Sequence, residues 1–506
     1  MLRVYQLGSV PVSLYWDEAS LGYNAFSIAT TLHDEHGEFL PYSRFIAFGD
    51  YKPPGYIYAD ALAIKFLGLS EFSTRLPSAL AGTILVLVTF FLVTQLFGNQ
   101  ITALLASLFV VISPWSLQMS RAAFEANFAT LLSGTGILFF LKAVKAKSII
   151  FYLLSAVFFV ASIYTFNSHR VFVPLMIGGL SLIFIRALLS QWKRALFFFA
   201  CCLILVGPLI PHLLSREGSL RFTEVSWVND LSLIEKSNKL IAQDGGGLVA
   251  RVIHNRRVIF AQQFLAHYTD NFKGSFLFFS GDANPKLSIQ TIGELYWLDL
   301  PFLLVGLFYL LKQKNKSSAV IFLWLLTAPI PAAFARETPH ALRILQILPI
   351  PQIIIALGVT KVFQKKILCI IYPLFLLFYA RDYYFNYPQK YALDWEYGYK
   401  DMVTYVKSVE NNYNAIQITN KYGRPYIYML FYNKYSPEKY WQNRKVDRDW
   451  YGFWYVHSFD KYYFDAPLPF GKTLFVREPE NTPKEAKIKK QIFDFSGKVV
   501  FNIYEI

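Results

Sequence analysis

Long apolar runs alternate with short polar loops over most of the chain. A membrane-spanning helix needs about 20 mostly apolar residues, and runs of this kind recur between residues 76 and 384 without a charge at their centres. The pattern predicts a polytopic α-helical membrane protein with about ten transmembrane helices. They are expected at 76–97, 100–118, 124–142, 148–166, 169–187, 194–213, 295–312, 318–335, 343–360 and 366–384.

The last segment, 385–506, has a different pattern and is rich in Tyr, Lys, Asp and Asn. Helical and alternating apolar periods both occur in it. The expected elements are an amphipathic helix at Gly398–Asn411, a second apolar element at Tyr426–Tyr432, and strands at Ala415–Thr419, Thr473–Glu478 and Val499–Ile506. This mixture predicts a small soluble α/β domain after the transmembrane domain of 76–384.

Positive charge is distributed unequally between the loops. One alternating set of short loops carries twelve Lys and Arg residues, and the other set carries only Arg121, Arg170, Arg336 and Arg343. Cytoplasmic loops are the ones enriched in Lys and Arg. The first set is therefore expected in the cytoplasm, which places 1–75, the large loop 214–294 and 385–506 on the extracytoplasmic face of a plasma membrane.

This topology exports residues 1–75 with no preceding span to carry them. Met1 to Gly8 is too short for a signal peptide. We therefore expect a further transmembrane helix upstream, with MLRVYQLG as its outer end. An upstream reading frame encoding about 15–20 more apolar residues would support this hypothesis, and an in-frame stop codon just before Met1 would contradict it.

Composition agrees with a membrane protein. The chain is 54% hydrophobic and 16% charged, whereas soluble domains carry about 25% charged residues. The net charge of +15 does not indicate nucleic-acid binding, because the Lys and Arg residues lie mostly in short loops. All three Cys residues lie inside apolar runs, so neither a disulfide framework nor a zinc site is indicated.

Ionisable residues gather at the expected outer boundary of the membrane. Such groups are costly near lipid and are candidates for function. The stretches are LYWDEASLGYNAF with Asp17 and Glu18, FGDYKPPGYIY with Asp50 and Lys52, FSTRLPSAL with Arg75, and SPWSLQMSRAAFEANF with Arg121 and Glu125. Glu125 follows Arg121 by four residues, which would place both on one face of a helix.

Each of these residues also has a structural interpretation. Asp17 is in a position to cap a helix, and Glu18 would then be an ordinary first-turn acid. Glu125 could pair with Arg121, and Lys52 could extend along the membrane surface. The ordered set is stronger evidence for a site than any one member.

The order of motifs resembles a known family. An acidic pair in the first outer loop, then KPP, RLPSAL, and SR followed by an acid is similar to the GT-C superfamily of lipid-dependent glycosyltransferases. Within it, the chain resembles the protein-mannosyltransferase-like family, which includes lipid A aminoarabinose transferases. FFSGDANPKLSIQTIGELYW (278–297) and RETPHALRILQILP (336–349) are similar to outer loops of that family. The resemblance covers most of 12–360.

The resemblance implies an inverting glycosyltransferase. It would move a sugar from a polyprenyl-phosphate donor to a hydroxyl on a protein, lipid or glycan, with Asp17 as general base. Glu18 would shape or polarise the site, and Glu125 would bind acceptor or sugar. Lys52, Arg121, His340 and Arg343 would hold the lipid phosphate and stabilise its developing charge, and Asp50 and Arg75 complete the expected binding set.

No cofactor is expected. Related oligosaccharyl transferases use a divalent metal, but the sequence has no compact spacing of His, Asp and Glu that would favour one here.

Three alternatives remain. A transporter or lipid flippase would carry charges near the bilayer midplane, where these spans have none. A glycan polymerase or ligase would carry its key residues in a late outer loop rather than the first. A sensor would rely on the C-terminal domain, which has no catalytic motif.

Overall fold

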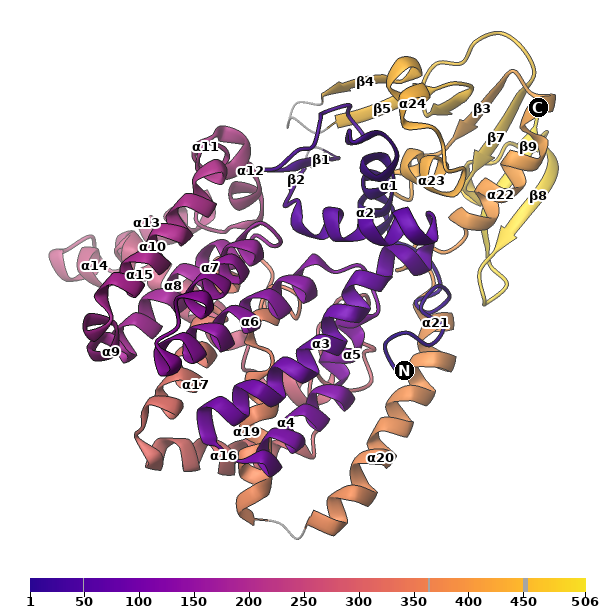
Figure 1. Ribbon diagram of the computed structural model, residues 1–506. Helices are drawn as coiled ribbons and strands as arrows, with labels where there is room; N and C mark the ends of the chain where they lie inside the picture. The colour runs from indigo at the N-terminus through magenta and orange to yellow at the C-terminus, as the bar shows by residue number, and fades with distance from the viewer. Residues whose placement is uncertain (49, 363–364, 449–453) are drawn as a thin grey trace. The chain divides into compact units, whose positions relative to one another are not determined.

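The computed structural model describes residues 1–48, 50–362, 365–448 and 454–506. The chain divides into two compact units. The first comprises Met1–Ala81, Ser120–Glu125 and Leu376–Ile506, and the second comprises Gly82–Met119 and Ala126–Phe375. The first and last parts of the chain therefore fold together, and α3 (Glu71–Phe97) and α20 (Lys365–Arg381) run from one unit into the other (Figure 1).

Every predicted membrane span coincides with a helix or with consecutive helices. After α3 come α4 (Gln100–Ile112), α5 (Pro114–Ser120), α6 (Glu125–Ala146), α7 (Ile149–Ile163), α8 (His169–Ile183), α9 (Ile185–Ser190), α10 (Trp192–Val206) and α11 (Ile210–Leu214). The later group is α16 (Asp299–Gln313), α17 (Lys316–Thr327), α18 (Ile330–Ala333), α19 (Ile350–Val362) and α20. The prediction of a multi-pass helical membrane protein is confirmed.

Among the described residues, four helical stretches are long and apolar enough to cross a membrane: Glu71–Phe97, Glu125–Ala146, Trp192–Leu214 and Lys316–Ala333. The α4–α5 pair passes the same test together but is bent by 57°. Shorter apolar helices account for several other predicted spans, and the figure of about ten spans stays a prediction.

The loop predicted at 214–294 is mostly helical. It contains α12 (Arg216–Val225), α13 (Leu231–Gln243), α14 (Leu248–Ile253) and α15 (Arg256–Asp270). Several of its large apolar side chains are exposed, including those of Leu231, Leu248 and Val249. Short helices with apolar exposed faces are typical of segments at a membrane surface.

In the first unit, the chain begins with a series of turns over residues 1–13, so MLRVYQLG does not form the end of a helix here. Helix α1 (Trp16–Thr31) follows, then an antiparallel hairpin of β1 (Phe45–Ala47) and β2 (Asp50–Lys52), and α2 (Gly55–Leu67). In the hairpin, Phe45 lies opposite Lys52 and Ala47 lies opposite Asp50.

The C-terminal domain is a mixed seven-stranded sheet with helices, which confirms the predicted α/β class. Its strand order is β4-β5-β6-β3-β7-β9-β8. The strands are β3 (Ala415–Ile418), β4 (Lys445–Arg448), β5 (Trp454–Phe459), β6 (Tyr462–Phe464), β7 (Thr473–Arg477), β8 (Lys487–Phe493) and β9 (Val499–Glu505). Its main helices are α22 (Tyr399–Val409), α23 (Pro425–Tyr432) and α24 (Pro437–Asn443).

Helix α1 packs against α2 and α23, although about 400 residues separate α1 and α23 in sequence (Figure 1). Gly22 makes this approach possible, because a Cβ there would lie 2.6 Å from Phe431 Cε2 and from Thr74 Oγ1. The Tyr23 hydroxyl donates to the Tyr435 carbonyl at 3.1 Å. The first outer segment and the C-terminal domain therefore share one core.

Candidate functional site: a buried and a half-exposed ion pair

The predicted acidic pair lies in the first turn of α1. The helix begins at Trp16, its N-cap residue is Tyr15, and the Tyr15 side chain makes no capping bond. Glu396 instead accepts from the Trp16 N–H at 2.8 Å. Acidic groups are favoured at a helix N-terminus, where unsatisfied N–H groups point outward. Because consecutive helical residues differ by about 100° in direction, Asp17 and Glu18 face different surroundings.

Asp17 is the accessible member of the pair. Its side chain is 35% exposed, and Oδ1 accepts from Lys52 Nζ at 2.6 Å. The Lys52 side chain is only 8% exposed and extends from the end of β2. The predicted general base and the predicted phosphate-binding lysine are therefore in direct contact.

Glu18 is the enclosed member. Its side chain and that of Arg75 are both 0% exposed. Arg75 binds the carboxylate through two parallel bonds, Nε to Oε1 at 2.9 Å and Nη2 to Oε2 at 3.0 Å. The Ala123 N–H also donates to Oε1 at 2.8 Å. This is the bidentate geometry that gives Arg–carboxylate pairs their strength and direction.

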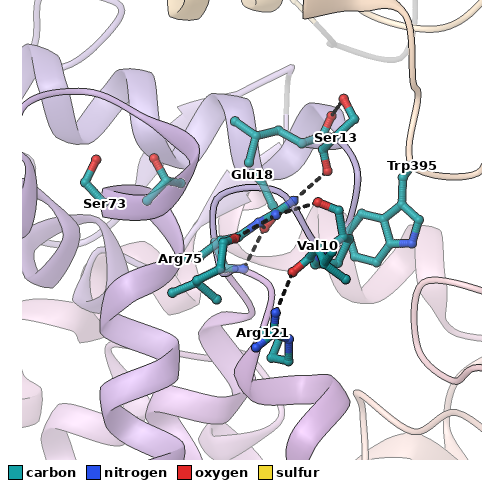
Figure 2. A network of polar contacts seen from close by, with 12 residues as sticks. Val10, Ser13, Glu18, Ser73, Arg75, Arg121 and Trp395 are labelled. Carbon is teal, nitrogen blue, oxygen red and sulfur yellow. Dashed lines mark hydrogen bonds and ion pairs between the residues drawn. The ribbon is translucent and has the colours of Figure 1, made fainter. Parts of the chain in front are cut away.

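Arg75 gathers the turns that precede α1. Its remaining donors reach the carbonyls of Leu7 at 3.1 Å, Pro11 at 2.8 Å and Ser13 at 2.5 Å (Figure 2). All five N–H groups of a guanidinium are thus engaged within the protein.

Arg121 also binds backbone carbonyls of the turns that precede α1. It donates to the carbonyls of Leu2 at 2.7 Å, Tyr5 at 2.7 Å and Val10 at 3.0 Å, and to the Tyr383 hydroxyl at 3.2 Å. Figure 2 shows the contact with Val10. Only 1% of Arg121 is exposed. The two arginines together fix residues 2–13. Their predicted contacts with substrate stay predictions, but in this structure their donors serve the protein itself.

Glu125 begins α6 and is half-buried. The prediction that Arg121 and Glu125 share one helical face is wrong, because α5 ends at Ser120 and the chain bends before α6. The bend turns Arg121 towards the carbonyls of residues 2–10. Its predicted contact with acceptor or sugar stays a prediction.

Several acids lie close enough to Tyr15 to raise the pKa of its hydroxyl. Burial raises the pKa of its hydroxyl well above the usual range, and the charges of Asp17, Glu18, Glu125 and Glu396 raise it further. Four carboxyl groups therefore lie within electrostatic range of one buried ring.

A fifth acid, Asp60 on α2, was not predicted. It is fully buried, and neither of its carboxyl oxygens has a hydrogen-bond partner among the described residues. Burial and the nearby Glu18 raise the pKa of Asp60 well above its usual value, so its carboxyl group is favoured in the neutral form.

Three predicted residues remain, two in the second unit and one in strand β2. His340 and Arg343 belong to the second unit, where His340 Nδ1 lies 3.9 Å from Asp282 Oδ2 and Arg343 Nη1 donates to the Glu337 carbonyl at 3.2 Å. The backbone of Asp50 lies in β2 opposite Ala47, and its side chain is outside the described part of the structure. Within the described residues, no three His, Cys, Asp or Glu side chains gather closely enough to hold a metal ion.

Sequence reasoning missed Glu396 and Trp395. Trp395 lies 5.9 Å from the Arg75 guanidinium, and Glu396 supports the start of α1 from 380 residues away. Only the local cluster DWEYGY marks them in the sequence, and nothing in it indicates their partner.

The chain is similar in fold to the GT-C glycosyltransferases, as the sequence motifs predicted. Residues 51–213 match the family described as dolichyl-phosphate-mannose-protein mannosyltransferase. This matched range contains Lys52, Arg75, Arg121 and Glu125.

Among solved structures, the chain is similar to ArnT from Cupriavidus metallidurans. The apo form has a TM-score of 0.57 at 9% identity, covering 100% of this chain and 95% of ArnT. The form bound to undecaprenyl phosphate has a TM-score of 0.56 at 10% identity, covering 100% and 96%. This likeness establishes the fold.

A more distant match is the oligosaccharyltransferase AglB from Archaeoglobus fulgidus, with a TM-score of 0.45 at 12% identity, covering 83% of this chain and 60% of AglB. No curated protein matches the chain.

Proposed function

We propose that the protein is a membrane glycosyltransferase that moves a sugar from a polyprenyl-phosphate donor to a hydroxyl acceptor on the extracytoplasmic face. The observation that carries the proposal is the Asp17 carboxylate, 35% exposed and in contact with Lys52, on a helix whose start is fixed by the buried Glu18–Arg75 ion pair. The mannosyltransferase family match and the undecaprenyl phosphate bound to ArnT support a lipid-phosphate donor.

The reaction is a direct displacement. Asp17 takes the proton of the acceptor hydroxyl, and the oxygen forms a bond with the anomeric carbon of the sugar. The bond from that carbon to the phosphate oxygen breaks, and its electron pair leaves with polyprenyl phosphate. The carboxyl proton of Asp17 then passes to water. A single displacement inverts the anomeric centre and needs only one base.

Lys52 links the base to the leaving group. Without donor, its ammonium neutralises Asp17 at 2.6 Å. A donor phosphate brings a competing negative charge, and Lys52 can turn towards it because an ammonium on a four-carbon chain has no fixed direction. This exchange frees Asp17 to accept a proton and provides positive charge where the phosphate oxygen becomes more negative.

Glu18, Arg75 and Arg121 act through position rather than through contact with substrate. They hold the turns before α1 and the first turn of the helix in place. Enzyme groups must be held to within a fraction of an ångström of their productive geometry. Glu125 remains the candidate for contact with acceptor or sugar.

The test is single-turnover release of polyprenyl phosphate from a labelled lipid-linked sugar by purified protein. Loss of a general base should slow release by a factor of about 100 or more, so we expect this of Asp17→Asn. Asp401→Asn is the matched control, because Asp401 is an exposed first-turn acid on α22. Equal rates for Asp17→Asn and wild type would place the base elsewhere. No release by wild type across a panel of lipid-linked sugars would contradict the transferase proposal.

A further inference from the structure

Four arginines lie near His36 and Trp454, where the first outer segment meets the C-terminal sheet. We call Arg44, Arg424, Arg444 and Arg448 the arginine cluster. Arg448 lies opposite Trp454 in the β4–β5 register, with its guanidinium 4.7 Å from the ring centroid. Arg424 Nη1 lies 3.5 Å from the Trp454 carbonyl. All of these residues belong to the first unit.

Each guanidinium in the cluster lies over an aromatic ring. Besides Arg448 over Trp454, the pairs are Arg424 over Phe48 at 5.6 Å, Arg44 over Tyr51 at 5.8 Å and Arg444 over Tyr440 at 5.4 Å. Stacking occupies the flat face of a guanidinium and leaves the N–H groups at its edge available. A ring contact therefore orients the fork of donors without consuming it.

Two of the four arginines have their donors engaged. Arg44 binds both oxygens of Glu38, at 2.9 and 2.7 Å. Arg444 donates to the carbonyl of Glu35 at 2.9 Å and to that of His36 at 3.1 Å. Arg424 and Arg448 have no carboxylate partner in the part of the chain that the structure describes. Within the described residues, the cluster thus holds two ring-stacked guanidinium groups without a carboxylate partner.

A buried histidine and the ring of Trp454 lie beside these arginines. The His36 ring lies 5.1 Å from the Trp454 ring. Burial and the charges of Arg444, Arg448 and Arg44 lower the pKa of His36 to about 3, so it is neutral. Its Nδ1 lies 3.3 Å from Arg444 Nη1, which can only donate. The His36 proton is therefore assigned to Nε2.

The indole N–H of Trp454 is buried without a hydrogen-bond partner among the described residues, whereas the His36 ring has a backbone hydrogen bond with Ile46 that works against the fall in its pKa. Buried donors without acceptors are costly. Among the described residues, Arg424 and Arg448 have no carboxylate partner and the Trp454 indole N–H has no acceptor.

The cluster lies close to the proposed base. Gly423, which precedes Arg424, has a φ of +113° and packs directly on Trp16, because a Cβ there would lie 2.4 Å from Trp16 Cε3. Trp16 is the neighbour of Asp17. In the β1–β2 hairpin, Lys52 contacts Asp17 at one end, and Phe48, which lies under Arg424, is at the other. At about 3.3 Å per residue, the hairpin separates the two ends by roughly 10–15 Å.

We propose that the arginine cluster binds an oxyanion of the acceptor, so that the enzyme glycosylates a molecule carrying a phosphate or a carboxylate within roughly 10–15 Å of the reacting hydroxyl. Identification of this ligand as the acceptor rests on the proposed function. Binding of the oxyanion rests only on the cluster. The anion would lie between the guanidinium groups of Arg424 and Arg448, beside Trp454.

The test measures binding of three fluorescent oligomers to the full-length protein in lipid nanodiscs. Oligogalacturonate carries carboxylates, oligo(glycerol phosphate) carries phosphates, and a malto-oligosaccharide carries no charge. Charge-assisted bonds to two guanidinium forks are strong, so Arg424→Gln/Arg448→Gln should weaken binding of one or both anionic probes by about tenfold or more. The anionic probe whose affinity falls more shows whether the site prefers a phosphate or a carboxylate.

Lys484→Gln/Lys490→Gln is the matched control, because it removes the same charge from exposed residues, one of them on the β8 edge of the sheet. It should bind both anions as wild type does. Arg448→Lys keeps the positive charge and loses the bidentate donors of the guanidinium, so it should bind the anions with intermediate affinity. Such binding would also show that the protein still folds when the cluster is altered. Equal losses in the control and cluster variants, or equal binding of the neutral probe, would overturn the proposal.

The two proposals can fail separately. If wild type releases no sugar from any lipid donor but binds an anionic probe through Arg424 and Arg448, the proposed function fails and the oxyanion site stands. If sugar release depends on Asp17 but the cluster variant binds anions as wild type does, the oxyanion site fails and the proposed function stands.

Discussion

Two ion pairs at the start of α1 involve neighbouring acids and have different environments. Glu18 and Arg75 are completely enclosed, and every donor of the arginine is engaged. Asp17 is one-third exposed, and its partner Lys52 makes a single bond to it. The first pair organises the chain around it, and the second pair has room for another molecule. Residue type alone therefore does not distinguish a structural acid from a candidate catalytic one.

The energetics of the two pairs differ for the same reason. Removing one partner of a buried pair leaves an unpaired charge in a low-dielectric interior and costs about 3–5 kcal/mol. A pair that water can reach is usually worth about 0–1 kcal/mol, because water and salt screen it. The comparison predicts that stability depends on Glu18 and Arg75, whereas activity depends on Asp17 and Lys52.

The largest expected effect is that of Arg75→Gln. This change leaves the Glu18 carboxylate buried without its cation and frees the carbonyls of Leu7, Pro11 and Ser13. We expect destabilisation by about 3–5 kcal/mol, seen as a large fall in the thermal midpoint of purified protein and as fast amide exchange over residues 2–18. An unchanged midpoint and unchanged exchange would mean that the buried pair does not hold this segment.

Glu35 provides an intermediate case. It is a fully buried acid, and its side chain accepts from two neutral groups in the described structure, the Tyr426 hydroxyl at 2.9 Å and the Asn24 amide at 3.2 Å. Burial raises the pKa of Glu35 from 4.5 to about 7. Because the folded state holds the proton more tightly than the unfolded state, stability from this group is full below about pH 4.5 and is lost as pH rises towards 7.

Glu35→Gln keeps the shape and cannot ionise. At pH 8 it should be more stable than wild type by roughly 3 kcal/mol, since each pKa unit corresponds to about 1.4 kcal/mol. Near pH 5 the difference should fall to about 1 kcal/mol or less. Thermal midpoints of both proteins from pH 5 to pH 8 provide the measurement. A difference that does not change with pH would show that Glu35 is ionised throughout.

The sequence predicted those features that depend on local patterns. The apolar runs located the helices, and alternation located β3, β7 and β9. The pattern EASLGYNAF after Asp17 correctly indicated a helix with an acidic first turn. Strands β4, β5, β6 and β8 were missed, and Tyr426–Tyr432, predicted only as an apolar element, is helix α23. β4 is mostly exposed and β6 has three residues, so neither has a clear two-residue period.

Partners distant in sequence could not be predicted. Nothing near Arg75 indicates that its donors reach carbonyls more than 60 residues earlier, and nothing near Trp16 indicates a cap from Glu396. The arginine cluster likewise unites residue 44 with residues 424–448. The sequence predicted the charged residues of the candidate site, and the tertiary fold determines which of them are enclosed.

The smallest expected effect is on the stability contributed by the Asp17–Lys52 pair. A double-mutant cycle with Asp17→Asn and Lys52→Gln should give a coupling free energy of unfolding of no more than about 1 kcal/mol. The same two variants should each slow release of polyprenyl phosphate. Asp17→Asn removes the base, and Lys52→Gln removes the positive charge that stabilises the leaving phosphate. High salt should reduce the coupling further, since screening acts on groups that water can reach. A coupling of about 3 kcal/mol or more, insensitive to salt, would show that Asp17 and Lys52 form a structural pair like Glu18 and Arg75, and the search for the base would then move to Glu125.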